Sequence, residues 1–319
     1  MLIRSLTVFA ALLLSTVAGN AGLPVDVTVA QNGCAGAVAN DGADDYAAIQ
    51  CHINYMNTNF GGGVLVFPSG AYETSQTLVV PGAEMLTGMG AAVTSISSLG
   101  GADVKVLRFD GPSNSFGGMD SIRIVCSQST VAKQPCVHVS HNVPVTFRDC
   151  HIWGGQHGLQ QDGVDGMIIN CIIAAAALDG ANLFSRGANW YVRTKFNPYA
   201  GQTVRYAYAQ NDWAQTPNNG LQENHFVQCD FSGTFTHDAV AIYDNNTNRA
   251  ITTFEGSVFS APVTITAARA TLFNGVEFGS TTLKSDAPIS LVGNYAVNAP
   301  IAVTGTGTRE CAGNLYITC

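Results

Sequence analysis

The segment Cys136–Phe184, CVHVSHNVPVTFRDCHIWGGQHGLQQDGVDGMIINCIIAAAALDGANLF, contains a repeat. The short runs CVHVS, GLQQD and GANLF begin at Cys136, Gly158 and Gly180, so each starts 22 residues after the one before. Two further runs, FRDCHI and IINCII, alternate with them at a spacing of 21 residues. Most of these runs have the length of a β-strand, are rich in Val, Ile and Phe, and are bounded by Gly, Asp or Asn.

The repeat continues less regularly through VRYAY (204–208), FVQCDF (226–231), AVAIY (239–243), TFEGSVF (253–259), PVTIT (262–266) and LFNGVEF (272–278). A fixed period with several short strands per period is typical of a β-solenoid, and the consensus of leucine-rich repeats is absent. Strands that stack coil on coil run parallel, and parallel crossovers are right-handed in nearly all cases. The sequence therefore predicts an all-β chain, a single-stranded right-handed parallel β-helix.

Stacked coils place equivalent residues in columns along the helix axis. We predict one inward column of Val137, Leu159, Ala181 and Val240, and a second of Val139, Gln161, Leu183 and Ile242. The buried amide of Gln161 then requires hydrogen-bond partners along the ladder. Cys150, Cys171 and Cys229 share one phase of the repeat, which predicts a stack of small buried thiols.

The other six cysteines form three pairs that are close in sequence. We expect the disulfides Cys34–Cys51, Cys126–Cys136 and Cys311–Cys319, although sequence alone leaves the connectivity open.

The first residues have the pattern of a secretory signal peptide. Arg4 precedes an apolar run at residues 6–18, and small residues follow up to Ala21. The run is shorter than the ~20 residues of a transmembrane helix, and no later run is long enough. We predict a signal peptide at residues 1–21 and a secreted, soluble protein from about Gly22, with no membrane partner. The net charge of −8 argues against a nucleic-acid partner.

A solenoid must cover its open end. The stretch DGADDYAAIQ (41–50) places three carboxylates close together, Asp41, Asp44 and Asp45, which suits either a divalent metal or the start of a helix. Apolar residues follow at helical spacing, and Asp44 or Asp45 is well placed to cap that helix. We therefore predict an N-terminal capping helix, structural acids and no metal site. The predicted domain, residues 22–319, comprises a cap at about 38–60, coils at about 61–305 and a tail at 306–319.

The runs DGADDYAAIQ, GGGVLVFPSGAY (61–72) and LTGMG (86–90) resemble the N-terminal signature of the pectate-lyase-like superfamily. This superfamily includes rhamnogalacturonase- and epimerase-like β-helix proteins, and the resemblance covers about residues 38–96. It implies that this segment is the end cap, and that the partner is a polysaccharide bound or cleaved along one outer face. Superfamily members are monomers or trimers, so the oligomeric state stays open.

Carboxylates are few along the repeat, so Asp162, Asp179 and Asp238 stand out. We place Pro135, His157, Asp179 and Asp238 in the column just before the GLQQD-type strands. Outward columns within those strands are His138, Gln160, Asn182 and Ala241, then Ser140, Asp162, Phe184 and Tyr243. We predict Asp179, Asp238, Asp162 and His237 as catalytic residues. The alternative is that these aspartates only form turns, because Asp-Gly is an ordinary turn dipeptide.

The repeat loosens between residues 185 and 222, where aromatic and basic side chains gather. Sugar rings stack on aromatic faces, and the guanidinium fork of Arg matches a uronate carboxylate. The predicted substrate-binding residues are Arg186, Trp190, Tyr191, Lys195, Arg205 and Trp213, together with Tyr243 on the outward column. The alternative is a longer coil with ordinary aromatic packing.

Coil spacing offers a test of mechanism. Neighbouring coils lie ~4.8 Å apart, so Asp179 and Asp238, if two coils apart, suit the wide carboxylate pair of an inverting glycosidase. A lyase would instead need Arg or Ca²⁺ to neutralise the substrate carboxylate, and a base. Arg186, Lys195, Arg205 and His237 are the candidates for these roles.

The polygalacturonase motifs and the calcium-site motifs of well-known pectate lyases are missing, as are zinc-type ligand spacings. The leading hypothesis is a secreted enzyme, a lyase or a hydrolase, that cleaves an extracellular, uronate-containing polysaccharide, with Ca²⁺ as cofactor only if it is a lyase. The alternative is a glycan-binding or surface-structural β-helix without catalysis.

Overall fold

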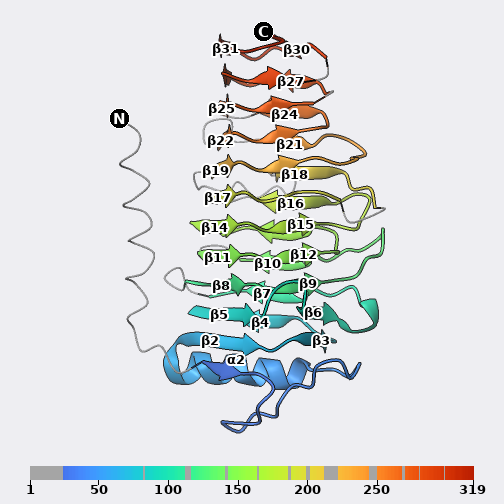
Figure 1. The fold of residues 1–319 in the computed structure, drawn as a ribbon, viewed down its shortest axis with the longest axis vertical. Coiled ribbons are helices and arrows are strands. Elements are labelled where there is room, and N and C mark those ends of the chain that lie inside the picture. The colour runs from blue at the N-terminus through green and yellow to red at the C-terminus, as the bar shows by residue number, and fades with distance from the viewer. Residues whose placement is uncertain are drawn as a thin grey trace.

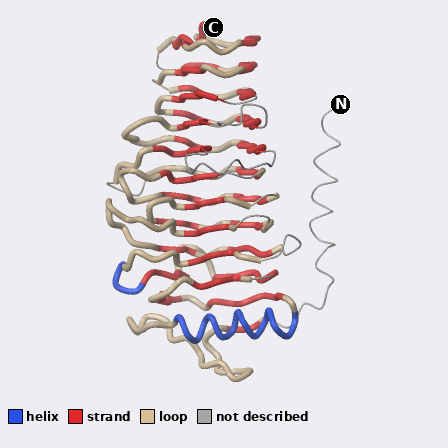
Figure 2. The backbone as a smooth tube through the Cα atoms, turned by 180° about the vertical axis from the view of Figure 1, so that it is seen from behind, coloured by secondary structure: helices blue, strands red, loops and turns tan. Residues whose placement is uncertain are grey.

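The structure is a computed structural model that describes residues 24–81, 83–111, 116–140, 143–163, 165–185, 188–198, 202–211, 222–243, 250–267, 270–279, 281–297 and 299–319. Within these residues the chain winds into a tall stack of coils (Figures 1 and 2). The predicted signal peptide, residues 1–21, lies outside the described residues. In the described part of the chain, no helix is both long enough and apolar enough to cross a membrane.

Two long sheets run the length of the stack. The first has twelve strands, β1 (Val25–Asp26), β2 (Gly62–Phe67), β5 (Ala83–Gly88), β8 (Gly117–Asp120), β11 (Val145–Arg148), β14 (Gly166–Ile169), β17 (Asn189–Val192), β19 (Gln222–Val227), β22 (Ala250–Glu255), β25 (Ala270–Asn274), β28 (Ile289–Val292) and β31 (Arg309–Ala312). The second has eleven, β4 (Leu78–Val80), β7 (Leu107–Phe109), β10 (Val137–Val139), β13 (Leu159–Gln161), β16 (Ala181–Ser185), β18 (Tyr206–Asn211), β21 (Val240–Tyr243), β24 (Val263–Ala267), β27 (Leu283–Ser285), β30 (Ile301–Thr304) and β32 (Ile317–Thr318).

Two shorter sheets complete the coils. One contains β3 (Gly70–Thr74), β6 (Thr94–Ser98), β9 (Arg123–Val125), β12 (His151–Trp153) and β15 (Ile172–Ala174). The other contains β20 (Asp230–Phe231), β23 (Val258–Phe259), β26 (Glu277–Phe278) and β29 (Tyr295–Ala296). The strands of each sheet pair in parallel with their neighbours, which confirms the predicted parallel β-helix. Strands β31 and β32 continue the sheets into the segment 306–319, beyond the predicted last coil.

Helix α2 (Tyr46–Phe60) lies under the first coil, as Figure 1 shows. Its buried side chains include Ile49, Ile53 and Met56, which belong to the same core as the strands above. The helix ends at Gly61, which has a left-handed φ of 69° and donates its N–H to the Asn57 carbonyl at 2.9 Å. The predicted capping helix is confirmed.

Of the two aspartates predicted as caps of α2, Asp44 is the one that binds a helix amide. Asp44 Oδ1 accepts the Tyr46 N–H at 3.0 Å, so Asp44 binds a helix amide. Asp45 makes no cap bond; its oxygens accept the N–H groups of Val38 at 2.8 Å and Glu73 at 3.2 Å. Asp45 therefore ties the cap segment to the first coil, which supports the structural interpretation of these acids.

The predicted inward columns fail at one coil, the one that contains β16. Val137 pairs with Leu159 as expected, but Leu159 pairs with Leu183 and not with Ala181. The column continues through Tyr208 to Val240. The next column accordingly contains Ser185 and Gln210 where Leu183 was predicted. The cause is that the coil from Leu159 to Leu183 is two residues longer than the coil from Val137 to Leu159. The extra length lies in the turn before β16, which contains residues 175–177, all alanine and all buried.

The polar members of the core are hydrogen-bonded to one another. Gln161 Nε2 donates to Asn189 Oδ1 at 3.0 Å, so the predicted partner of this buried amide exists. Ser185 Oγ donates to Asn224 Oδ1 at 3.1 Å in the same region. These bonds satisfy part of the hydrogen-bonding capacity of the buried amides and hydroxyls. Gln161 Oε1 and Asn224 Nδ2 have no hydrogen-bond partner among the described residues.

Aromatic rings fill the core of the later coils. Phe226, Phe254 and Phe273 stack face to face, with ring centroids 5.0 and 5.1 Å apart. Tyr191 extends this stack at 4.7 Å from Phe226. Ring stacking between equivalent positions stabilises the register of adjacent coils.

The cysteines follow the prediction. The three expected disulfides, Cys34–Cys51, Cys126–Cys136 and Cys311–Cys319, are present. Cys150, Cys171 and Cys229 are free and buried. Their column includes one residue that the repeat did not indicate, because Thr194 stands between Cys171 and Cys229.

Candidate functional site

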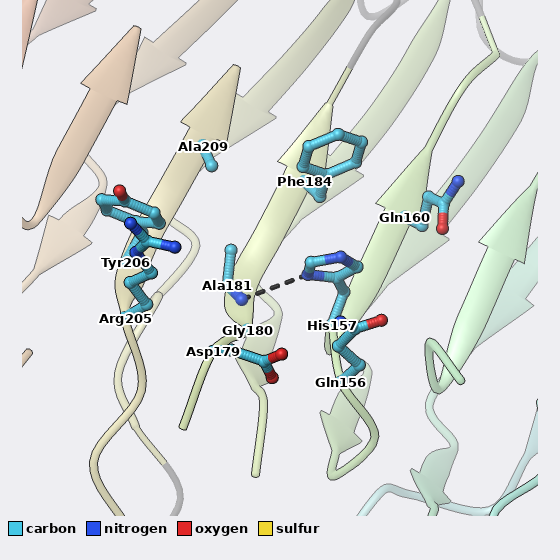
Figure 3. A pocket seen from close by; sticks show the side chains of 10 residues that line it. All are labelled: Gln156, His157, Gln160, Asp179, Gly180, Ala181, Phe184, Arg205, Tyr206 and Ala209. Carbon is cyan, nitrogen blue, oxygen red and sulfur yellow. Dashed lines mark hydrogen bonds between the residues drawn. The ribbon is translucent and has the colours of Figure 1, made fainter. Parts of the chain in front are cut away.

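The outer face of the 11-stranded sheet holds a pocket of about 340 Å³ (Figure 3). It lies over β13, β16 and β18, where three successive coils are in register through the row Gln160, Phe184 and Ala209. The lining residues are Gln156, His157, Gln160, Asp179, Gly180, Ala181, Phe184, Arg205, Tyr206 and Ala209. Asp179 and Arg205 are the two predicted site residues among them.

His157 is held by two contacts within the pocket. Its Nδ1 accepts the Ala181 N–H at 3.1 Å, drawn as a dashed line in Figure 3. Its ring stacks on Phe184 with centroids 5.0 Å apart. Because an imidazole nitrogen that accepts a hydrogen bond carries no hydrogen, the hydrogen of neutral His157 is on Nε2. Neutral His157 is therefore a hydrogen-bond donor, and not an acceptor, at Nε2.

Arg205 and Tyr206 line the pocket from the coil of β18, which follows the coil that contains Asp179 and Phe184. The Arg205 guanidinium lies over the Tyr206 ring, 5.2 Å from its centroid. The Arg205 N–H donates to the Gly180 carbonyl at 3.0 Å, which ties this residue to the neighbouring coil. The pocket thus presents a half-buried cation beside an aromatic face.

Asp179 is exposed and lies in the turn that leads into β16. Among the described residues that line the pocket, it is the single carboxylate. Figure 3 shows it on the same side of the pocket as Gln156, with Arg205 and His157 on the two flanking coils. The pocket therefore brings together one carboxylate, one guanidinium, one imidazole donor and two aromatic rings.

Asp238 and His237 lie beside the pocket and not in it. The His237 ring is 5.8 Å from the Tyr206 ring, one coil further along the helix. Burial raises the pKa of the half-buried Asp238 carboxyl, although a hydrogen bond from Thr264 opposes this shift. Asp238 is level with Tyr206 and Ala181, two residues beyond Asp179, so the predicted column that aligned Asp179 with Asp238 is wrong.

Asp162 is not among the residues that line the pocket, and it lies directly after the end of β13. Its Oδ2 accepts Gln160 Nε2 at 2.8 Å and lies 3.0 Å from His138 Nε2. The carboxylate is buried, so it does not face a bound substrate directly. It holds the Gln160 amide, and Gln160 lines the pocket.

The predicted substrate-binding residues do not converge on one face. Tyr191 is fully buried in the ring stack, so its prediction as a binding residue is wrong. Trp190 is 47% exposed on the 12-stranded sheet, stacked on His225 at 4.1 Å. Lys195 bridges Ile172 and Asp230 on a third face. Arg186 and Trp213 lie outside the described residues, and Tyr243 is described only as part of the β21 backbone.

The sequence contained signals for the residues that were missed. His157 and Tyr206 each stand at the start of a repeat strand, level with Ala181 in the register. Trp190 and Tyr191 are neighbours in one strand, and neighbouring side chains of a strand point to opposite faces. One of these two rings therefore had to be inside.

The donor set does not fit a metal ion. Ca²⁺ takes 6–8 oxygen ligands, usually with several carboxylates, whereas this pocket combines Asp179 with the cationic Arg205. In the described part of the chain, no group of three or more His, Cys, Asp or Glu residues is arranged to hold a metal.

No family model matches the chain, and no curated protein matches it in sequence. Solved structures match its fold. ORF18 of Geobacillus virus E2 is 16% identical, with a TM-score of 0.56, over 91% of this chain and 60% of that protein. The tailspike gp49 of Acinetobacter baumannii bacteriophage Fri1 is 12% identical, with a TM-score of 0.57, over 92% of this chain and 57% of that protein. The fold is a right-handed parallel β-helix.

The β-helix also matches a bacterial surface protein along nearly its whole length. PfbA, a surface adhesin of Streptococcus pneumoniae, is 13% identical, with a TM-score of 0.52, over 92% of this chain and 93% of that protein. By contrast, the chain spans only about 60% of the length of the two phage proteins. At these identities the likeness concerns the fold alone.

Proposed function

We propose that this β-helix binds an acidic extracellular polysaccharide along the outer face of its 11-stranded sheet and cleaves it by β-elimination in the pocket. The supporting observation is the meeting of Asp179, Arg205 and His157 in one pocket with two aromatic rings. A guanidinium pairs with a uronate carboxylate, and aromatic faces stack on sugar rings. An elimination needs one base, and the pocket contains one carboxylate.

In this reaction Arg205, Asp179 and His157 have separate roles. Arg205 pairs with the uronate carboxylate and stabilises the negative charge that grows there as the adjacent carbon loses its proton. Asp179 takes that proton as general base. The electron pair forms a carbon–carbon double bond while the glycosidic C–O bond breaks, and the departing oxygen takes its proton from solvent. The Nε2–H of His157 donates a hydrogen bond that positions the sugar.

The positions of the acids favour elimination over hydrolysis. Asp179 and Asp238 are two coils apart and offset by two residues along the strands. Their Cα atoms are thus roughly 12 Å apart at ~4.8 Å per coil and ~3.3 Å per residue. The two carboxyl groups of an inverting glycosidase are ~6.5–9.5 Å apart. The Asp238 carboxyl is directed away from Asp179, because it accepts a hydrogen bond from Thr264 on the following coil.

Two further observations agree with a secreted protein that acts on glycans. Three disulfides are typical of an oxidising, extracellular compartment. The fold matches include gp49, described as a capsular polysaccharide depolymerase, and the tailspike of E. coli bacteriophage HK620, solved with a pentasaccharide (TM-score 0.55, 9% identity). These descriptions concern those proteins, and they make the same substrate class a reasonable first test here.

The test is depolymerisation of a panel of acidic polysaccharides, including polygalacturonate, alginate and hyaluronate. Elimination yields both new reducing ends and ultraviolet absorbance from unsaturated uronate. New reducing ends without that absorbance would instead indicate a hydrolase and overturn the proposed elimination.

Asp179→Asn should abolish turnover, because a carboxamide cannot accept the proton. Asp165→Asn is a matched control, since Asp165 is also an exposed aspartate before a glycine and lies outside the pocket. Control turnover should equal that of the wild type. Full turnover by Asp179→Asn with normal folding by circular dichroism would remove Asp179 from the site.

A second candidate function is glycan binding without cleavage. It is favoured by the position of Asp179, which is exposed and belongs to an Asp-Gly turn. The turn alone is enough to explain why an aspartate occurs there, without a catalytic role. Binding of an acidic glycan by calorimetry, with no products from any member of the panel, would support this candidate.

A further inference from the structure

A second pocket, of about 370 Å³, lies on the same outer face nearer the N-terminal end. It is lined by Thr77, Val79, Asp103, Val104, Lys105, Arg108 and Gln134, around strands β4 and β7. Figure 1 shows these strands several coils away from β16 and β18, which border the first pocket. Two cationic side chains, Lys105 and Arg108, line it.

The two pockets lie on one line along the helix axis. Val137 pairs with both Leu107 and Leu159, so these three residues form one row across neighbouring coils. Lys105 and His157 each precede a member of this row by two residues, so they occupy equivalent positions along their coils. The same register places Lys105 level with Tyr206. The order β7-β10-β13-β16-β18 contains four steps, which corresponds to roughly 19 Å at ~4.8 Å per coil.

The polar side chains between the pockets are in contact with each other. Lys105 Nζ lies 3.5 Å from His138 Nδ1, and His138 Nε2 lies 3.0 Å from Asp162 Oδ2. Asp162 in turn accepts the amide of Gln160, which lines the first pocket. A polar row therefore joins one pocket to the other across β7, β10 and β13.

The charges of the second pocket favour an anion. The Asp103 carboxylate already accepts the N–H groups of Lys133 at 2.8 Å and Gln134 at 3.2 Å. Arg108 pairs with Asp110 at 2.5 Å, whereas Lys105 forms no ion pair with a carboxylate of the described chain. Burial and the neighbouring Arg108 lower the pKa of Lys105. A bound anion would offset the repulsion between these two cations.

We propose that this second pocket is an anion-binding subsite of the same groove, in which Lys105 and Arg108 bind a carboxylate or sulfate on a sugar unit distant from the one in the first pocket. The inference rests on the proposed function, since it assigns both pockets to one acidic glycan strand. It adds a length requirement: a strand must span four coils to reach both cationic sites, so a disaccharide fills only the first.

The experiment measures the dissociation constants of oligogalacturonates and oligomannuronates, from disaccharide to octasaccharide, by calorimetry. Lys105→Gln should weaken octasaccharide binding about tenfold, equivalent to ~1.4 kcal/mol, through loss of one charge-assisted contact. Disaccharide binding should be unchanged. Lys284→Gln is the matched control, because Lys284 is an exposed lysine in the same outward row as Arg108, on the other side of the first pocket.

Three results would overturn the subsite while leaving the proposed function intact. The first is unchanged octasaccharide binding in both Lys105→Gln and Arg108→Gln. The second is that Lys105→Gln weakens disaccharide binding as much as octasaccharide binding. The third is that Lys284→Gln weakens octasaccharide binding as much as Lys105→Gln does, which would indicate only long-range attraction. Failure of the wild type to bind any acidic oligosaccharide would overturn the proposed function and the subsite together. Melting temperatures confirm folding, and Lys105→Gln keeps the Arg108–Asp110 pair.

Discussion

Gly180 fixes the place of the carboxylate in the pocket. A Cβ atom at this residue would lie 1.7 Å from the Gln156 carbonyl oxygen of the neighbouring coil, so no larger residue fits without moving the backbone. The turn is therefore held against the previous coil at the residue next to Asp179. The exposed side chain of Asp179 therefore extends from a backbone whose position is fixed by packing.

The half-buried Asp238 beside the pocket gives a prediction about pH. Burial raises the folded-state pKa of Asp238 above its ordinary value of 3.8, so the folded protein retains this proton to higher pH than the unfolded chain. Stability is therefore lost as pH rises through that range, and the penalty persists at neutral pH. Asp238→Asn removes the charge and should raise the melting temperature at about pH 7, with a smaller gain at about pH 3.

Thermal melts of Asp238→Asn and the wild type at the two pH values test this sign. Turnover should be retained, because Asp238 does not line the pocket. A lower melting temperature at neutral pH would show that the Thr264 bond to the ionised carboxylate outweighs its burial.

At the scale of elements, the N-terminal cap and the first coil are joined by side-chain oxygens. Asp45 accepts two backbone N–H groups from segments on either side of the helix, at Val38 and Glu73. Gln50 makes a similar connection, since its Oε1 accepts the Val79 N–H at 2.8 Å. The helix is thus fastened to the strands by polar contacts as well as by its apolar face.

Asp45→Asn should lower the free energy of unfolding by about 1–3 kcal/mol, because the new NH₂ group faces a backbone N–H and leaves it without an acceptor. Urea denaturation measures the change. Asp41→Asn is the control, as Asp41 is exposed and accepts one N–H, from Ala43, so one amide oxygen suffices. Equal effects of the two substitutions would contradict the tie assigned to Asp45.

The column of free thiols gives a second prediction for the elements. Burial raises the pKa of Cys229 to about 12 and that of Cys171 well above its ordinary value. Because the thiolate is the reactive species, neither should react with iodoacetamide in the folded protein at about pH 8. Mass spectrometry should find Cys150, Cys171 and Cys229 unlabelled in the folded protein, and all three labelled after denaturation without reduction. Labelling of Cys171 before unfolding would contradict the buried column.

For the whole molecule, each coil packs on its two neighbours, so stability is distributed along the axis. The two ends have one partner fewer, and each has a disulfide. Cys34–Cys51 joins α2 to the segment before it, and Cys311–Cys319 lies in the last coil. Local opening should therefore begin at the ends when these bonds are removed.

Replacing Cys311 and Cys319 by serine should cost about 2–4 kcal/mol of local stability. Hydrogen exchange should become faster in β30, β31 and β32 and stay unchanged in β11 to β16. Replacing Cys34 and Cys51 should give the mirror result, with faster exchange in α2 and β2. Uniformly faster exchange in either variant would indicate one cooperative unit and contradict the distributed view.

Sequence patterns predicted the coils, the capping helix and the disulfides because each depends on local spacing or on the burial of an open end. The pocket depends on the relative register of three coils, and spacing between similar runs does not determine it. Gly158 and Gly180 begin similar runs, yet Leu159 pairs with Leu183. The prediction therefore included Asp179 and Arg205 and missed His157 and Tyr206 beside them.

The long turn before β16 has a consequence for how a surface of this kind can change. His151 pairs with Ile172, 21 residues further along the chain, whereas Leu159 pairs with Leu183, 24 residues further along, so the turn between β15 and β16 is three residues longer than the turn between β12 and β13. Because the extra residues lie outside the paired strands, Leu183 still packs inward beside Leu159. A binding surface on this scaffold can therefore be remodelled by lengthening or shortening one turn, without changing which side chains of the strands face the core.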